Sequence, residues 1–218
     1  MKVSVIGLGY IGLPTATVLA SHKVEVVGVD VSKHVVDTVN QGKIHIVEPE
    51  LDVLVHNAVK NGYLRATIYP EESDIFMVAV PTPFKDNHEP DMSYIESAVK
   101  AIAPVLNKGN VVILESTSPV GSTEKITRWM QELRPELTFP VFGEDEVEFD
   151  IYVAHCPERV LPGRIIHELI KNDRIIGGMT IRCSEHAKIV YEIFVEAKCI
   201  VTDCRAAELT KLVENSFR

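Results

Sequence analysis

The stretch "KVSVIGLGYIG", Lys2 to Gly12, decides the fold of this chain. Its first residues are rich in β-branched side chains and favour a buried strand. Glycines follow in the spacing G-x-G-x-x-G, at Gly7, Gly9 and Gly12. The first permits a tight turn, the second lets main chain approach a pyrophosphate, and the third lets a helix pack closely on the strand. A strand that turns through such glycines into a helix is typical of a dinucleotide-binding domain.

One acidic residue strengthens this interpretation. Asp30 ends the second strand-like run, where a carboxylate accepts the hydroxyls of an adenosine ribose. Because it would repel a 2′-phosphate, it favours NAD over NADP, although the nearby Lys33 weakens that preference. The alternative is a glycine turn needed for packing alone, which leaves the acidic residue unexplained.

The rest of the chain continues the alternation of strands and helices. Further apolar runs predict strands at 74–80, 110–116, 151–156, 173–178 and 198–203. Helical patterns are expected at 10–21, 32–42, 48–62, 91–106, 118–133, 184–197 and from about 205. Continuous apolar strands between helices indicate an α/β fold with a doubly wound, mostly parallel, Rossmann-like sheet. The acidic, proline-containing segment 134–150 is expected to form a surface loop or a short hairpin.

The composition excludes several classes of function. The 218 residues are 46% hydrophobic and carry a net charge of -9, which disfavours nucleic acid or an anionic membrane surface as a partner. Neither a signal peptide nor a membrane-spanning apolar run is recognisable, so a cytoplasmic protein is expected. The four cysteines lack C-x-x-C pairs and zinc spacing, which predicts reduced thiols and no metal site.

Two threonines stand directly after predicted strands. Open α/β sheets bind ligands at the carboxyl ends of their strands, so Thr82 and Thr117 are candidates for cofactor contacts. The alternative is local turn and cap chemistry, which would also suit Ser118 before Pro119 at the start of a helix. The residues alone leave both possibilities open.

The loop "AHCPERVLPGR", Ala154 to Arg164, follows another predicted strand. Its prolines restrict it, so it can present Glu158 and Arg159 to a ligand at little entropic cost. The alternative is an exposed loop that makes ion pairs. A cysteine in this position, Cys156, is more typical of a small core residue than of a reactive thiolate.

The last fourteen residues, "RAAELTKLVENSFR", form a helical pattern with two different faces. Three polar residues that suit oxyanion or phosphate binding share a stripe with Glu208: Lys211, Asn215 and Arg218. The alternative is a solvated helix face. The opposite stripe is apolar and needs cover from another domain or subunit: Leu209, Leu212, Val213 and Phe217.

Together, these motifs resemble one family, the nucleotide-sugar 6-dehydrogenases. The resemblance runs through the whole chain, in "VIGLGYIGLPTA", "HIVEPEL", "VAVPTPF", "ESTSPVGST", "AHCPERVLPG", "NDRIIGG" and "AAELTKLVENSFR". The segment "CPERVLPG" favours the branch that oxidises UDP-N-acetylmannosamine. UDP-glucose dehydrogenases, the alternative, usually carry a second glutamate where Pro162 stands.

The resemblance also implies roles for individual residues. It implies that NAD is bound by Gly7, Gly9, Tyr10, Ile11, Gly12, Asp30, Thr82 and Thr117. It implies that the UDP-sugar is bound by Arg159, Val160, Lys211, Asn215 and Arg218. Lys211 matches the catalytic lysine, and Glu158 matches a glutamate of the hydrolytic step. Thr117 and Asn215 would position a water molecule and the oxyanion.

The family reaction is a four-electron oxidation at C6 of the sugar, which consumes two NAD+ and proceeds through a cysteine thioester. The family's nucleophilic cysteine lies beyond the lysine helix, before a UDP-binding domain, and no segment here resembles either. We therefore expect an amino-terminal half, with an NAD-binding domain at 1–204 and the start of a linking helix at 205–218. It should bind NAD without forming the acid, and the full-length enzyme should form a homodimer through this helix.

Two other classes remain open. The β-hydroxyacid and 6-phosphogluconate dehydrogenases share the opening fingerprint, but they are not expected to carry "ESTSPVGST" followed by "CPER". A non-catalytic module that senses NAD for a partner protein is the alternative of another class. Separate titrations with NAD and a UDP-sugar distinguish them, because a sensor needs only the first ligand.

Overall fold

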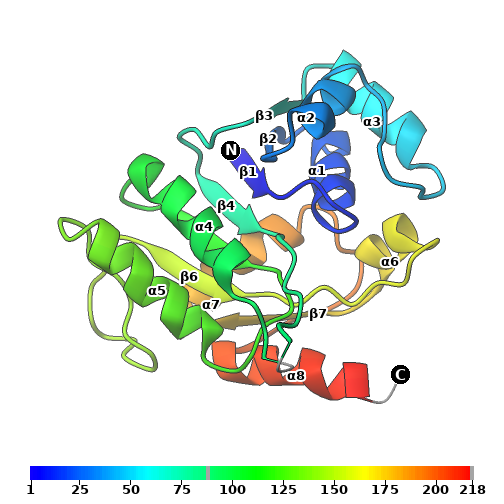
Figure 1. Cartoon of the computed structure of the whole chain (residues 1–218). Helices are drawn as coiled ribbons and strands as arrows, with labels where there is room; N and C mark the ends of the chain where they lie inside the picture. The colour runs from blue at the N-terminus through cyan, green and yellow to red at the C-terminus, as the bar shows by residue number, and fades with distance from the viewer. Residues whose placement is uncertain (87–88, 217–218) are drawn as a thin grey trace.

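The computed structural model of the chain describes residues 1–86 and 89–216 (Figure 1). Its strands are β1 (Lys2–Ile6), β2 (Glu25–Val29), β3 (Leu64–Thr67), β4 (Ile75–Val78), β5 (Val111–Leu114), β6 (Tyr152–His155), β7 (Arg174–Gly178) and β8 (Cys199–Asp203). Its helices are α1 (Gly12–Ser21), α2 (Lys33–Asn40), α3 (Leu51–Lys60), α4 (Ser93–Ile102), α5 (Ser122–Leu133), α6 (Ile165–Lys171), α7 (Ile181–Tyr191) and α8 (Cys204–Ser216). A 3₁₀ turn, Ala103–Val105, follows α4.

The strands form one sheet in the order β3-β2-β1-β4-β5-β6-β7-β8. The neighbouring strands run parallel, except that β6 and β7 are antiparallel. The strand order reverses between β1 and β4, which creates the switch point where such sheets bind ligands. The prediction of a doubly wound, mostly parallel sheet is confirmed.

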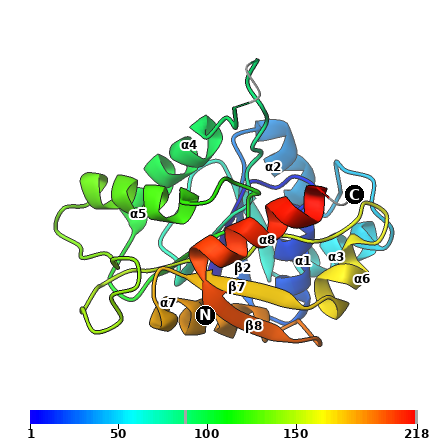
Figure 2. The same ribbon diagram turned by 90° about the horizontal axis from the view of Figure 1, so that it is seen from below.

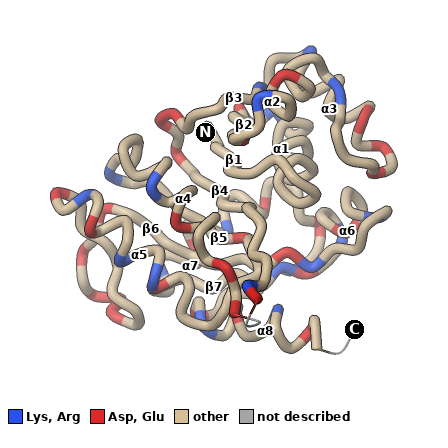
Figure 3. Tube along the Cα trace, viewed as in Figure 1, with Lys and Arg blue, Asp and Glu red and all other residues tan. Residues whose placement is uncertain are grey.

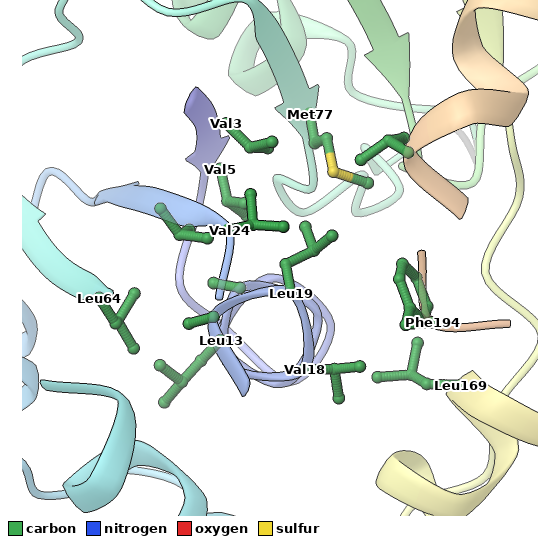
Figure 4. Close-up of a cluster of buried hydrophobic side chains, with 14 of the residues drawn as sticks. Val3, Val5, Leu13, Val18, Leu19, Val24, Leu64, Met77, Leu169 and Phe194 are labelled. Carbon is green, nitrogen blue, oxygen red and sulfur yellow. The ribbon is translucent and has the colours of Figure 1, made fainter. Parts of the chain in front are cut away.

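Helices cover both faces of the sheet because its central strands are apolar on both sides. All residues of β4 and β5 are buried. One core lies between the sheet and the group of α1, α3, α6 and α7, where Leu19 of α1 sits among Val5, Met77 and Phe194 (Figure 4). The second core joins the other face to α4 and α5 and includes Cys204 of α8. The two cores fix the strand ends rigidly.

Several elements differ from those that the sequence predicts. The strand β3 and the helix α6 were not predicted, and α5 begins at Ser122 instead of Ser118. Ser118 therefore caps no helix, and the N-cap residue of α5 is Gly121. Helix α7 begins earlier than predicted and ends at Tyr191. Segment 134–150 has no helix or strand, as expected for a loop.

Helix α8 crosses the sheet near β7 and β8, on the face that also carries α5 (Figure 2). Two residues of the polar stripe are buried, since Glu208 is fully buried and Lys211 is 8% exposed. The alternative of a solvated face is therefore wrong for both residues. Leu209 and Val213 of the apolar stripe are 52% and 46% exposed. Phe217 and Arg218 lie outside the described residues.

Charged residues are distributed over the molecule without a basic face in the view of Figure 3, where Lys and Arg are scattered among Asp and Glu. Within residues 1–86 and 89–216, no helix has the length and apolar character needed to cross a membrane.

Candidate functional site

The glycine-rich turn lies at the switch point, between the ends of β1 and β4. Gly7 has a φ of +91°, and a Cβ there would lie 2.7 Å from the carbonyl oxygen of Ala79. A Cβ on Gly12 would lie 1.7 Å from the carbonyl oxygen of Gly7. The fold itself therefore requires glycine at these two positions.

Gly9 differs from the other two glycines of the turn. Its φ is not positive, and a Cβ there would meet no protein atom within 4 Å. Neither backbone strain nor packing requires glycine at this position. Open space in front of the amides at the start of α1 is the arrangement in which a pyrophosphate approaches the main chain. The turn therefore fits a dinucleotide.

A cavity of about 450 Å³ adjoins this turn and contains Asp30 in its wall. The Asp30 carboxylate accepts hydrogen bonds from the N–H groups of Leu8, at 3.0 Å, and Ser32, at 2.9 Å. The Asp30 carboxylate therefore stabilises the glycine turn and also lines the cavity. Lys33, which weakened the preference for NAD, forms an ion pair with Asp37 instead. The mostly apolar wall suits an adenine ring.

A second cavity, of about 220 Å³, shares Val80 and Pro81 with the first. It lies over the ends of β4, β5 and β6. Six of the residues that the sequence singled out line it together: Ile11, Thr82, Thr117, Glu158, Val160 and Lys211. Segments distant in sequence thus converge on one crevice, which runs from Asp30 to Lys211.

The two threonines are linked to each other. The Thr82 hydroxyl donates a hydrogen bond of 2.6 Å to the carbonyl oxygen of Thr117. The neighbouring Ser116 hydroxyl donates to the carbonyl oxygen of Val80 at 2.7 Å. These bonds tie the loops after β4 and β5 together. Thr82 therefore joins two loops, which is not the local turn or cap chemistry of the alternative, and it also lines the cavity.

Glu158 is buried, with 5% of its surface exposed, and does not lie in an exposed ion-pairing loop. Its Oε2 lies 2.7 Å from NH1 of Arg174, which is itself 1% exposed. Its Oε1 accepts the N–H of Arg159 at 2.5 Å. A buried carboxylate with a buried cation holds the loop after β6 in one position.

Glu115, at the end of β5, is a cavity residue to which the sequence gave no role. It is 2% exposed, and the Tyr191 hydroxyl donates to its Oε1 at 2.8 Å. Burial and the neighbouring Glu158 charge raise the pKa of Glu115 to about 7. The signal available was its place as the first residue of "ESTSPVGST".

Cys156 is fully buried beside this group. Burial raises the pKa of its thiol far above the ordinary value, so the thiol stays protonated. The interpretation of Cys156 as a core residue is confirmed.

The remaining predicted residues lie further from the cavity. Arg159 points to Glu214 of α8, and its Nε donates to Glu214 Oε1 at 2.7 Å. Tyr10, beside the glycine turn, is 51% exposed. Asn215 is exposed, one turn beyond Lys211, and does not line the cavity. Arg218 lies outside the described residues.

Two buried glutamates position these segments. Glu208 accepts from the N–H groups of Gly121, at 2.6 Å, and Thr123, at 2.7 Å, and from the Thr123 hydroxyl at 2.6 Å. It therefore caps α5 and fixes α8, which carries Lys211. Glu48 accepts in the same way from the N–H groups of Gly163, at 2.8 Å, and Ile165, at 2.7 Å. It fixes the end of the Glu158 loop.

These features define a dinucleotide-binding α/β domain with a lysine at the reactive end of its crevice. Residues 1–195 match the UDP-glucose/GDP-mannose dehydrogenase family, NAD binding domain. The chain belongs to this family, and the domain is its NAD-binding domain.

Similar proteins agree with this assignment. An NDP-N-acetyl-D-galactosaminuronic acid dehydrogenase from Ralstonia nicotianae is 63% identical over 99% of this chain and 51% of its own length. A UDP-N-acetyl-D-mannosamine dehydrogenase from Campylobacter jejuni is also 63% identical, over 100% of this chain and 53% of its own length. The solved structure of a UDP-D-ManNAc dehydrogenase from Pyrococcus horikoshii matches the whole chain with a TM-score of 0.93 and 41% identity, and half of that chain is covered. The chain thus spans about half the length of its relatives.

Proposed function

We propose that the chain provides the NAD-binding part of a nucleotide-sugar 6-dehydrogenase that oxidises UDP-N-acetylmannosamine to UDP-N-acetylmannosaminuronate. The observation that carries the proposal is the crevice formed by two adjoining cavities, which share Val80 and Pro81. Its 450 Å³ part, beside Asp30, suits the adenosine end of NAD, and its 220 Å³ part contains Lys211. The relative from Campylobacter jejuni bears the name of this activity.

The proposed cofactor contacts follow the crevice. Main chain at Gly7, Gly9 and Gly12 faces the pyrophosphate, and Asp30 accepts the ribose hydroxyls. Tyr10, Ile11, Thr82 and Thr117 complete the contacts. Bound NAD+ supplies the hydride acceptor for oxidation at C6.

The proposed substrate contacts lie beyond the nicotinamide end. Lys211 stabilises negative charge on the sugar oxygen, because its ammonium group is held at a largely buried position in the cavity wall. Thr117 and Asn215 position a water molecule and the oxyanion, and Glu158 assists hydrolysis. Arg159, Val160 and Arg218 bind the UDP-sugar. To bind the UDP-sugar, Arg159 must break its hydrogen bond with Glu214 and contact the substrate instead.

A hybrid protein tests this function. The matching segment of the Campylobacter jejuni relative is replaced by this chain, and NADH formation from UDP-N-acetylmannosamine is followed. We expect steady turnover, and we expect Lys211→Met to lower kcat by about 10²-fold or more. The exposed Lys100→Met is the matched control and should change little. A hybrid that binds NAD+ but leaves every UDP-sugar unoxidised would contradict the proposal.

The sugar is a separate question, because a relative named for a galactosaminuronic acid is as similar as the mannosamine enzyme. The hybrid assay therefore includes UDP-N-acetylgalactosamine and UDP-glucose. A higher kcat/KM for either sugar would replace the substrate assignment and leave the reaction class unchanged.

We also infer that residues 1–204 form the NAD-binding unit and that α8 begins a linking helix that pairs two copies in the full-length enzyme. The exposed Leu209 and Val213 support pairing through this helix. A cytoplasmic location belongs to the same proposal, because the reaction uses NAD and a UDP-sugar, which are metabolites of that compartment.

A further inference from the structure

Two carboxyl groups line the cavity that contains Lys211, and their surroundings differ. Glu158 has a cation, since NH1 of Arg174 lies 2.7 Å from its Oε2. The Oε1 of Glu115 accepts a hydrogen bond from Tyr191. The Oε2 of Glu115 is buried and has no hydrogen-bond partner among the described residues. Glu115 thus lines the cavity and has a buried carboxyl oxygen that no described group satisfies.

The surrounding charges decide which of the two carboxyl groups carries a proton. The groups that face Glu115 are Glu158, Arg174 of β7 and Tyr191 of α7, with the thiol of Cys156 beside them. Arg174 forms an ion pair with Glu158, and the charge of Glu158 opposes ionisation of Glu115. Lys211 of α8 lines the same cavity. Ionising two neighbouring buried carboxyl groups together is energetically unfavourable. Of the two glutamates, Glu115 is therefore the one that gains and loses a proton near neutral pH.

We propose that Glu115 is the proton acceptor of this cavity, and that its Oε2 takes the proton of a bound primary hydroxyl while Glu158 keeps its ion pair with Arg174. The O–H bond of the hydroxyl breaks, an O–H bond forms on Oε2, and the electron pair stays on the substrate oxygen near Lys211. The inference rests on the proposed oxidation at C6, which must remove this proton. It gives the opening residue of "ESTSPVGST" a chemical role.

Tyr191 is a positioning residue in this scheme. Its hydroxyl donates to Oε1 and so stabilises the ionised carboxylate. Tyr191→Phe should therefore raise the pKa of Glu115 without removing any group that touches the substrate.

The first test uses the chain itself, labelled with ¹³C at the glutamate carboxyl carbon and titrated by NMR. One resonance should titrate near pH 7, vanish in Glu115→Gln and move to higher pH in Tyr191→Phe. The exposed Glu132→Gln is the control and should leave that resonance in place. The inference is overturned if Glu115→Gln removes only a resonance that titrates below pH 6.

Stability provides a second measurement on the same proteins. The pKa of Glu115 is raised from 4.5 to about 7 in the folded state, so its proton stabilises the fold fully below pH 4.5, and this contribution is lost as the pH rises through 7. Relative to Glu115→Gln, the unfolding constant of the wild type should increase about 140-fold between pH 4.5 and pH 8, so the wild type becomes less stable. A constant ratio across this range would contradict the assignment.

The hybrid enzyme tests the chemical step. Its kcat should decrease below about pH 7 as a single group becomes protonated. Glu115→Gln should lower kcat by about 10² to 10⁴-fold and abolish this pH dependence. The KM and the affinity for NAD+ should change little. If the variant retains both rate and pH dependence, the inference fails while the proposed function stands. If the unmodified hybrid oxidises no UDP-sugar, the proposed function fails, and the NMR titration still decides where the proton resides.

Discussion

At the scale of single residues, three glycines in one turn have different reasons to be glycine. The spacing in the sequence predicts a role for each glycine. The structure shows which of these glycines are required by packing and which one leaves space for a ligand. Gly7 and Gly12 are packed against backbone, and Gly9 faces open space. The spacing therefore includes two glycines that packing requires and one, Gly9, that packing does not require.

This difference yields a prediction for NAD+ binding. Gly9→Val should keep the fold, with a change in unfolding free energy of about 0.5 kcal/mol, because its side chain meets no protein atom within 4 Å. Its affinity for NAD+ should fall at least about tenfold, because the side chain occupies the path of the pyrophosphate. Calorimetric titration and chemical denaturation measure the two quantities.

Gly12→Ala is the matched comparison. Its Cβ collides with the carbonyl oxygen of Gly7, so it should cost about 3 kcal/mol of stability as well as binding. Equal loss of stability in both variants would show that Gly9 is also a packing residue.

Residue identities predicted much of the site, because strand-end positions follow from the α/β pattern. Thr117, Glu158 and Lys211 line one cavity, as the family resemblance implies, whereas their positions alone left other roles open. The only signal for Glu115 was its place at the start of "ESTSPVGST", because a glutamate after an apolar strand gives no indication of its neighbours. Tyr191 and Glu158 are distant from Glu115 in the sequence and become its neighbours only in the folded structure.

At the scale of elements, the errors at α5 and α6 share one physical cause. Helix starts are predicted from local cap residues, whereas α5 and α6 are capped by Glu208 and Glu48 from distant parts of the chain. The start of α5 was therefore placed too early and α6 was missed. The strand β3 was missed because "LRAT" is short and contains an exposed arginine, although it pairs with β2 along its whole length.

The Glu208 cap gives the second prediction. Glu208→Gln replaces one acceptor oxygen by a donor against buried N–H groups of α5, and it should lower the unfolding free energy by about 2 kcal/mol. Glu124→Gln is a control between the same two helices, since it breaks the more exposed pair with Arg205 and should cost less than about 1 kcal/mol. Denaturation curves of the two variants and the wild type provide the comparison. A smaller effect at Glu208 than at Glu124 would contradict the role of the buried cap.

At the scale of the whole molecule, α8 has its polar side against the domain and apolar side chains outside. This orientation places Lys211 in the crevice and leaves Leu209 and Val213 exposed. If α8 pairs two copies, sedimentation should show a dimer of the hybrid protein, and the double change Leu209→Glu and Val213→Glu should yield monomers with an intact fold. A monomeric hybrid, or a dimer unaffected by the two changes, would contradict pairing through α8.

The most direct test is a crystal structure of the chain with NAD+ bound. We expect the adenosine ribose at the Asp30 carboxylate, the pyrophosphate over Gly9, and the nicotinamide in the cavity lined by Thr117 and Lys211. A dinucleotide bound elsewhere, or a nicotinamide outside the Lys211 cavity, would contradict this expectation.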